Sequence, residues 1–209
     1  MDFRLRPARP SDSDTLAELI YISAQSHCLT SGYNLSLGGS REEQIAQLEK
    51  LTRTKAPSWF HYGHIDVAEV GGRAVAQAAG FERRAADAAV DAALVEIGYS
   101  PAEIEALNQR IAAVYACYPP EPKNYWTIEH VGVLPEFRRQ GLARAVVLCA
   151  MERGRKLGFR NCMLDEFKGN TAARALYESL GFRVTATFGE ETLPKLLDRE
   201  GIERMETLL

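Results

Sequence analysis

The chain has 209 residues, which is enough for one domain with an insertion or for two small domains. Hydrophobic residues make up 46% of it and charged residues 25%, the balance of a globular protein, which excludes disordered and collagen-like chains. The formal net charge is −3, so no overall positive excess favours nucleic acid or an anionic membrane as a partner.

Neither a targeting segment nor a disulfide framework is visible in the sequence. No stretch approaches the roughly 20 consecutive apolar residues of a membrane span, and the first residues, MDFRLRPARPSDSD, lack the apolar core of a signal peptide. The four cysteines never occur as C-x-x-C, and Cys149 and Cys162 lie in apolar segments. We therefore expect free thiols and a soluble, cytoplasmic protein.

The first part of the chain combines strands, helices and one hairpin. Alternating apolar and charged residues at the start predict a half-buried strand at a sheet edge, because Pro7 ends it. Gly71-Gly72 is a two-residue turn of the type that closes hairpins. In chain order, the predicted elements are a strand at 3–7, a helix at 13–26, a polar loop at 27–39, a helix at 41–53, and strands at 64–70 and 73–81.

Residues 82–124 interrupt this pattern. Their first part, up to Ile97, is rich in alanine and acidic residues. Ser100-Pro101-Ala102-Glu103 is a capping box with proline at the first helical position, which predicts a helix to about residue 116. The segment has too few large apolar residues for a core of its own. We therefore expect a helical insertion at about 82–124 within a single domain that comprises residues 1–209.

The rest of the chain alternates strands and helices. Gly158 and Gly181 mark the ends of two helices. The predicted elements are a strand at 125–133, a loop at 134–140, a helix at 141–157, a strand at 160–167, a helix at 170–180, and strands at 182–188 and 203–209. Strands interleaved with helices, and hairpins near both ends, predict an α/β (α+β) fold with a mixed sheet.

Positive charge is concentrated at the start of the helix at 141–157. Between Glu136 and Arg160, seven basic residues stand against two acidic ones, although the whole chain is acidic. The first turn of a helix has backbone N–H groups without an intrahelical acceptor, and the helix dipole adds partial positive charge. Gly141 lets an anion approach the backbone closely. The sequence therefore predicts a site for a small anion, with a solvated helix face as the alternative.

Two separate motifs resemble those of the GNAT (Gcn5-related N-acetyltransferase) superfamily. Arg138 to Ala143 reads R-x-x-G-x-A and follows a V-x-P-x-x-R lead-in that begins at Val133, which is similar to the cofactor motif of that superfamily. Asn170 to Phe182 reads N-x-x-A-x-x-L-Y-x-x-x-G-F, like its second signature. The resemblance covers about residues 2–81 and 125–209 and does not include the insertion.

The resemblance implies a GNAT fold that binds acetyl-CoA as a co-substrate. Its sheet would have about six to seven strands with flanking helices, and the fourth and fifth strands would splay apart. The pyrophosphate would lie on backbone amides between Arg139 and Arg144, and the pantetheine would pair with the strand at 125–133. The residues expected to bind the cofactor are Val131, Gly132, Val133, Arg138, Arg139, Gln140, Gly141, Leu142, Ala143, Arg144 and Asn170. The histidines lack metal-ligand spacing with any cysteine or acid, so no metal is expected.

The resemblance also assigns catalytic roles. Tyr177 lies two helical turns beyond Asn170, so the two side chains share a helix face. In the family the matching tyrosine protonates the departing CoA thiolate, with a core aromatic as the alternative for Tyr177. The matching asparagine commonly hydrogen-bonds the pantetheine arm, so we expect Asn170 both to cap its helix and to make that contact, with a plain N-cap as the alternative. Glu129 matches positions where some members carry a general base, with His130 or water as alternatives. Strand alternation places Glu129 and His130 on opposite faces unless a bulge intervenes.

The predicted function is transfer of an acetyl group from acetyl-CoA to a primary amine by direct attack. A small amine or amino-acid-like acceptor is favoured over two alternatives, a protein N-terminal or lysine acetyltransferase and a non-catalytic acyl-CoA-binding module. The loop at 27–39, the insertion and the last hairpin carry no motif that identifies the acceptor. Homodimers are frequent in the superfamily, and neither nucleic acid nor a membrane is expected as a partner.

Overall fold

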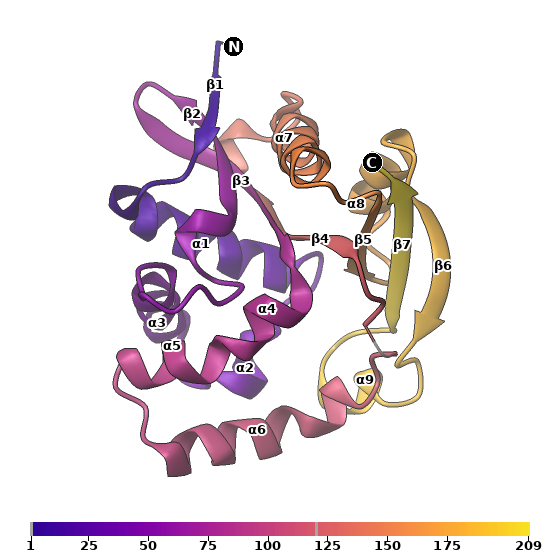
Figure 1. Ribbon diagram of the computed structural model, residues 1–209. Helices are drawn as coiled ribbons and strands as arrows, with labels where there is room; N and C mark the ends of the chain where they lie inside the picture. Colours follow the sequence, from indigo (N-terminus) through magenta and orange to yellow (C-terminus); the bar gives the residue numbers. More distant parts are fainter. Residues whose placement is uncertain (1, 120) are drawn as a thin grey trace.

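A mixed seven-stranded sheet forms the centre of the computed structural model, which describes residues 2–119 and 121–209 (Figure 1). The strands lie in the order β1-β2-β3-β4-β5-β7-β6. β4 and β5 are parallel, and the other neighbouring strands are antiparallel. Their bounds are β1 (Arg4–Pro7), β2 (Ile65–Val70), β3 (Arg73–Glu82), β4 (Tyr125–Val133), β5 (Asn161–Phe167), β6 (Arg183–Phe188) and β7 (Ile202–Leu208). The predicted mixed α/β sheet, with its first strand at an edge, is confirmed.

Helices cover both sides of β2 and β3. Figure 1 shows α1 and α3 on one side of these strands and α7 on the other. No helix in the described part of the chain is long and apolar enough to cross a membrane. The α-helices are α1 (Ser13–Gln25), α2 (Tyr33–Ser36), α3 (Arg41–Thr52), α4 (Arg83–Ala88), α5 (Val90–Glu96), α6 (Pro101–Tyr115), α7 (Leu142–Lys156), α8 (Thr171–Ser179) and α9 (Leu193–Leu196).

Local sequence signals explain where several of these elements begin. Ser100 caps α6, and Glu103 closes the predicted capping box. Ser40 forms the same arrangement with Glu43 at the start of α3. The Gly71-Gly72 turn of the β2–β3 hairpin has positive φ at both residues, as a type I′ turn requires. Two short helices were not predicted, α2 inside the polar loop and α9 before β7, because neither contains enough residues to show a helical period.

The insertion packs into the rest of the protein. Helices α4, α5 and α6 lie between β3 and β4 in the chain, and α6 runs along one end of the molecule toward α9 (Figure 1). Leu94, Ile104 and Leu107 from these helices are buried in the same apolar cluster as Leu48 and Leu51 of α3. Because the insertion shares its core with α1 and α3, its position relative to the sheet is fixed by apolar burial.

The sheet opens between β4 and β5. The two strands pair at three positions, of which the last is Thr127 opposite Met163, although β5 continues to Phe167. On its other side β4 remains paired with β3 as far as Val133. The described residues of β4 beyond Thr127 therefore present a free edge toward β5, which confirms the predicted splay of the fourth and fifth strands.

Candidate active site

The first turn of α7 has the geometry of an anion site. Gly141 is the N-cap with a φ of 79°, and a Cβ built on it would meet no atom within 4 Å. The helix ladder begins where the Ala145 N–H donates to the Gly141 carbonyl at 3.1 Å. The amides of Leu142, Ala143 and Arg144 therefore have no intrahelical acceptor. Gly141, the N-cap, has no side chain that could accept a hydrogen bond from them. This turn can bind an anion through main-chain N–H groups.

The basic residues of this segment divide between the two ends of α7. Arg138 and Arg139 lie exposed next to the free amides, and Arg144 donates to the Ser179 hydroxyl at 3.1 Å. At the other end, Arg155 and Lys156 pair with Glu152. Arg153 donates to the carbonyls of Gly63, His64 and Gly80 and forms an ion pair with Asp66 at 3.4 Å. Only the arginines at the first end are placed to contact an anion on the α7 amides.

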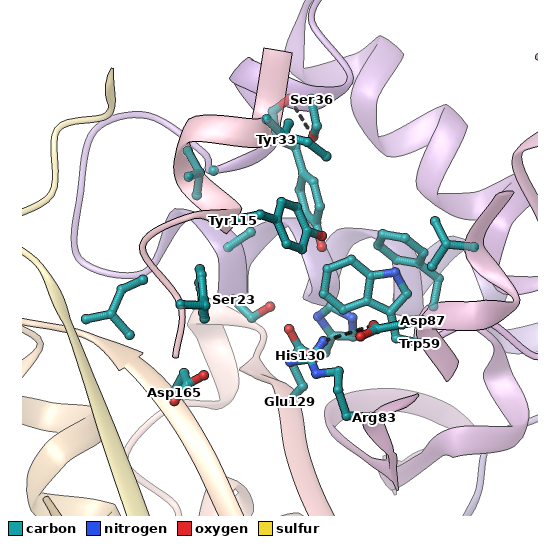
Figure 2. A pocket seen from close by; sticks show the side chains of 18 of the residues that line it. Ser23, Tyr33, Ser36, Trp59, Arg83, Asp87, Tyr115, Glu129, His130 and Asp165 are labelled. Carbon is teal, nitrogen blue, oxygen red and sulfur yellow. Dashed lines mark hydrogen bonds and ion pairs between the residues drawn. The ribbon is translucent and has the colours of Figure 1, made fainter. Parts of the chain in front are cut away.

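A cavity of about 720 Å³ lies next to the open edge of β4. Its wall includes β4 and β5, the end of α1, the loop around α2, and all three helices of the insertion. Figure 2 shows the polar part of the lining, where residues of the sheet face residues of the insertion. The sequence-predicted residues Val131, Glu129, His130 and Tyr177 all line this cavity, whereas Arg138 to Arg144 lie outside its lining.

Glu129 is the carboxylate at the middle of this arrangement. Its side chain forms an ion pair with Arg83 of the insertion at 3.0 Å, and Arg83 in turn stacks on Trp59, 4.9 Å from the ring centroid (Figure 2). Burial raises the pKa of Glu129 to about 7, because the opposing effect of Arg83 is offset by neighbouring carboxylates. Glu129 can therefore exchange a proton near neutral pH, as a general base must.

His130 lies at a bulge in β4. Its φ of 52° and the register shift opposite Gln77 and Ala79 show one extra residue on β4. The simple alternation that separates Glu129 from His130 is therefore wrong here, and both line the cavity. The His130 ring is 5% exposed and stacks on Phe60. Burial lowers its pKa to about 3, so the imidazole is neutral, and its Nε2 has no partner within the described residues.

Tyr177 presents a protonated phenol to the same cavity. The residue lies on α8, is 5% exposed, and packs edge-on against Phe182. Burial, with a smaller effect from the Glu166 carboxylate, raises the pKa of Tyr177 well above its usual range. The phenol is therefore neutral throughout the working pH range and can act only as a proton donor.

Asn170 is the N-cap of α8. Its Oδ1 accepts from the Ala173 N–H at 3.2 Å, and its Nδ2 donates to Ser26 Oγ at 2.8 Å and to Glu166 Oε1 at 3.0 Å. Asn170 thus forms the helix cap that the sequence predicted. A contact with a cofactor stays a prediction, and it would have to share or displace one of these hydrogen bonds.

Several polar residues of the cavity were missed by sequence reasoning. Asp165 makes a two-pronged ion pair with Arg204 at 2.9 Å, and burial raises the pKa of its neighbour Glu166 to about 7. These two acids directly follow the apolar run Cys162–Leu164, which is a signal for side chains at the end of a buried strand. Arg83 and Asp87 of the insertion had no such signal.

The described residues include no metal-ligand cluster and place no thiol at the cavity. Within residues 2–119 and 121–209, no cluster of three or more His, Cys, Asp or Glu side chains could hold a metal ion. All four cysteines are free thiols, as predicted, and none of them is among the residues that line the cavity.

The chain is similar to known acetyltransferases in sequence and in fold. The sequence model of the acetyltransferase (GNAT) family matches residues 40–182. The ribosomal protein bS18 alanine N-acetyltransferase of Escherichia coli is 38% identical over 74 residues, which are 35% of this chain and 49% of that protein. The matched segments span less than half the length of the first curated relatives.

Solved structures share the fold at low identity. An N-acetyltransferase from Staphylococcus aureus superposes with a TM-score of 0.73 at 19% identity, over 98% of this chain and 100% of that one. A putative acetyltransferase from Salmonella typhimurium, solved with its cofactor acetyl-CoA, gives a TM-score of 0.61 at 16% identity, over 100% of this chain and 95% of that one. Because the family match extends over more than half of the sequence, from α3 through α8, the chain belongs to the acetyltransferase (GNAT) family.

Proposed function

We propose that this protein is an N-acetyltransferase that moves the acetyl group of acetyl-CoA to a primary amine by direct attack. One observation carries the proposal: Glu129 and Tyr177, a carboxylate with a pKa near 7 and a neutral phenol, line one cavity beside the free edge of β4. A base and an acid with separated pKa values are what the two proton transfers of the reaction need.

The residues around the splay fit acetyl-CoA. The free amides from Leu142 to Arg144, with Arg138 and Arg139 beside them, suit a pyrophosphate. The unpaired edge of β4 at Val131 to Val133 suits the amide groups of a pantetheine arm, which would add to the sheet as an extra strand. When bound, acetyl-CoA supplies a thioester carbonyl and a thiolate leaving group.

Glu129 and Tyr177 would then divide the proton transfers. An acceptor amine with a pKa near 10.4 is almost entirely ammonium at pH 7. Forming the reactive neutral amine at that pH costs about 4.6 kcal/mol of free energy. Glu129 takes the amine proton, while a backbone N–H of β4 polarises the thioester carbonyl. A C–N bond forms as the C–S bond breaks, and Tyr177 gives its proton to the thiolate. The nitrogen loses its second proton as the amide forms, and this proton restores the Tyr177 phenol. No covalent enzyme intermediate is required, so none of the four cysteines need act as a nucleophile.

The insertion favours a small acceptor over a polypeptide. Leu107, Ile111 and Tyr115 of α6 form one wall of the cavity opposite the sheet. A helix across the acceptor side leaves room for a small molecule but obstructs an extended chain. The relative named for a ribosomal-protein alanine keeps N-terminal acetylation as the second candidate. The segment matched to that relative covers only 35% of this chain, so the match does not extend to a peptide-binding groove.

Ala143→Asp tests the cofactor site. A carboxylate in the first turn of α7 stabilises the helix through its dipole but repels an anion on the same amides. We expect the Kd for acetyl-CoA, measured by calorimetry, to rise at least tenfold while Tm is unchanged or higher. Arg155→Ala, at the other end of α7, is the control and should leave the Kd as it was. An unchanged Kd in Ala143→Asp would place the pyrophosphate elsewhere.

Thiol release with a panel of acceptors tests the activity itself. Purified protein with acetyl-CoA should release CoA thiol in the presence of small primary amines and much more slowly with a peptide that has a free N-terminus. Preference for the peptide would support the second candidate. Binding of acetyl-CoA without thiol release from any acceptor would identify a non-catalytic acyl-CoA-binding module.

A further inference from the structure

The cavity has a large excess of negative charge for a partly buried site. Arg83 is the only positively charged residue among its lining residues in the described part of the chain, since His130 is neutral. Against it stand six carboxylates, contributed by the sheet, by the insertion and by the segment before β4: Asp87, Asp91, Glu121, Glu129, Asp165 and Glu166.

Two guanidinium groups are shared among four of these carboxylates. Arg83 pairs with Glu129 at 3.0 Å and with Asp87 at 3.7 Å. Arg204, which lies behind the lining, pairs with Asp165 at 2.9 Å and with Glu121 at 3.2 Å. Asp91 and Glu166 form no ion pair within the described residues. The lining therefore keeps an uncompensated negative charge even after both arginines are counted.

The carboxylates destabilise one another's charged forms. Burial raises the pKa of Glu129, and the charges of Asp165, Asp87 and Glu121 raise it further. Burial likewise raises the pKa of Glu121, with contributions from Asp165 and Asp87. A cation in the cavity would relieve this repulsion, whereas an anion would add to it. Arg83 already lies beside Asp87 and Glu129, so a carboxylate of the acceptor would have to compete with these two acids for it.

The other lining groups suit an alkyl ammonium compound. Tyr33, Trp59 and Tyr115 present aromatic rings beside the acidic groups (Figure 2). Aromatic faces pack against methylene groups and attract cations. The neutral His130, 5% exposed and without a partner for Nε2, adds an unsatisfied polar atom in the same wall. A ligand with an N–H group or a water bound to it would satisfy this atom.

We infer that the acceptor carries a second positive charge and no carboxylate, as in an α,ω-diamine, with its alkyl stem against the aromatic wall. The inference rests on the proposed acetyl transfer. The reacting nitrogen must lose its proton to attack, so it cannot neutralise the cavity at that moment. A second ammonium at the far end of the acceptor keeps its charge and can. Amino-acid-like acceptors, which the sequence left open, would bring a carboxylate into a site that repels it.

Three acceptors that share one stem length test the inference: 1,4-diaminobutane, n-butylamine and 4-aminobutanoate. We expect kcat/KM in the thiol-release assay to be at least tenfold higher for the diamine than for n-butylamine, beyond the factor of two from its second amino group. The value for 4-aminobutanoate should be at least tenfold below that for n-butylamine. Both ratios should shrink only slightly as salt is raised, because partly buried charges are screened much less than exposed ones.

Variants connect the preference to the named acids. Asp91→Asn and Glu121→Gln, separately and together, should lower the ratio of diamine to n-butylamine by at least threefold. Glu152→Gln, on the far end of α7, is the matched charge change outside the cavity and should leave that ratio as in the unmodified protein. A ratio that stays high in the double variant would overturn the assignment of these acids as the selecting groups.

Calorimetry without acetyl-CoA separates this inference from the proposed function. Tighter binding of 1,4-diaminobutane than of n-butylamine supports the inference even when no thiol is released, a result that would overturn only the catalytic proposal. Equal binding and equal kcat/KM for these two amines would overturn the inference and leave the acetyltransferase proposal intact. Faster turnover of 4-aminobutanoate than of 1,4-diaminobutane and n-butylamine would also overturn the inference and leave the acetyltransferase proposal intact.

Discussion

Glu129→Gln is expected to lower kcat/KM for a primary amine by about 100-fold, the usual contribution of a positioned general base. Glutamine keeps the shape of the side chain and places an oxygen or an amide beside Arg83, but it cannot take a proton. The measurement is thiol release under steady-state conditions. Because Glu129 lines the cavity and the α7 amides proposed for the pyrophosphate lie outside that lining, we expect little change in the Kd for acetyl-CoA.

The pH profile distinguishes Glu129 from the other candidate bases. The carboxyl group is protonated below about pH 7, so activity is lost as the pH falls through that value. Since Glu129 takes a proton from the bound ammonium, log(kcat/KM) should rise with a slope of about 1 below pH 7 and level off above it. Glu129→Gln should show a slope of about 1 throughout. Neither His130, with a pKa of about 3, nor water would give an inflection near 7.

Glu166→Gln is the matched control for this experiment. Glu166 lines the same cavity and has its pKa raised by burial to about 7 as well, but it contacts Ser26 and Asn170 and not Arg83. The inflection should persist in Glu166→Gln and disappear in Glu129→Gln. The reverse pattern would make Glu166 the base and Glu129 a partner of Arg83 only.

Tyr177→Phe is expected to lower kcat at least tenfold with little effect on the Kd for acetyl-CoA. The ring and its packing against Phe182 remain, while the proton for the CoA thiolate is lost. Because the pKa of Tyr177 lies well above its usual range, the phenol stays protonated, and the deficit should be the same across the pH range.

Tyr125→Phe supplies the comparison for Tyr177. The Tyr125 hydroxyl donates to Glu206 at 3.2 Å, and the residue is not part of the cavity lining. Loss of the Tyr125 hydroxyl should leave kcat unchanged. If Tyr177→Phe also turned over at the unmodified rate in the thiol-release assay, the tyrosine would be a core aromatic and the thiolate would be protonated by water.

The features that the sequence determined by itself are local ones. The strand at 125–133, the glycine at the start of α7 and the spacing of Asn170 and Tyr177 on α8 each depend on residues within a few positions of one another. Backbone hydrogen bonding, φ preferences and helix periodicity act over that range. The anion-binding turn and the shared face of α8 could therefore be predicted before any tertiary contact was known.

The cavity was decided only by the tertiary structure. Arg83 reaches Glu129 across 46 positions of sequence, and Arg204 reaches Asp165 across 39, so neither pair leaves a periodic or motif signal. The bulge that turns both Glu129 and His130 toward the cavity depends on the register between β3 and β4. The insertion packs there because its apolar side chains share a core with α3. Long-range burial and charge pairing, which selected these neighbours, have no counterpart in the order of residues along the chain.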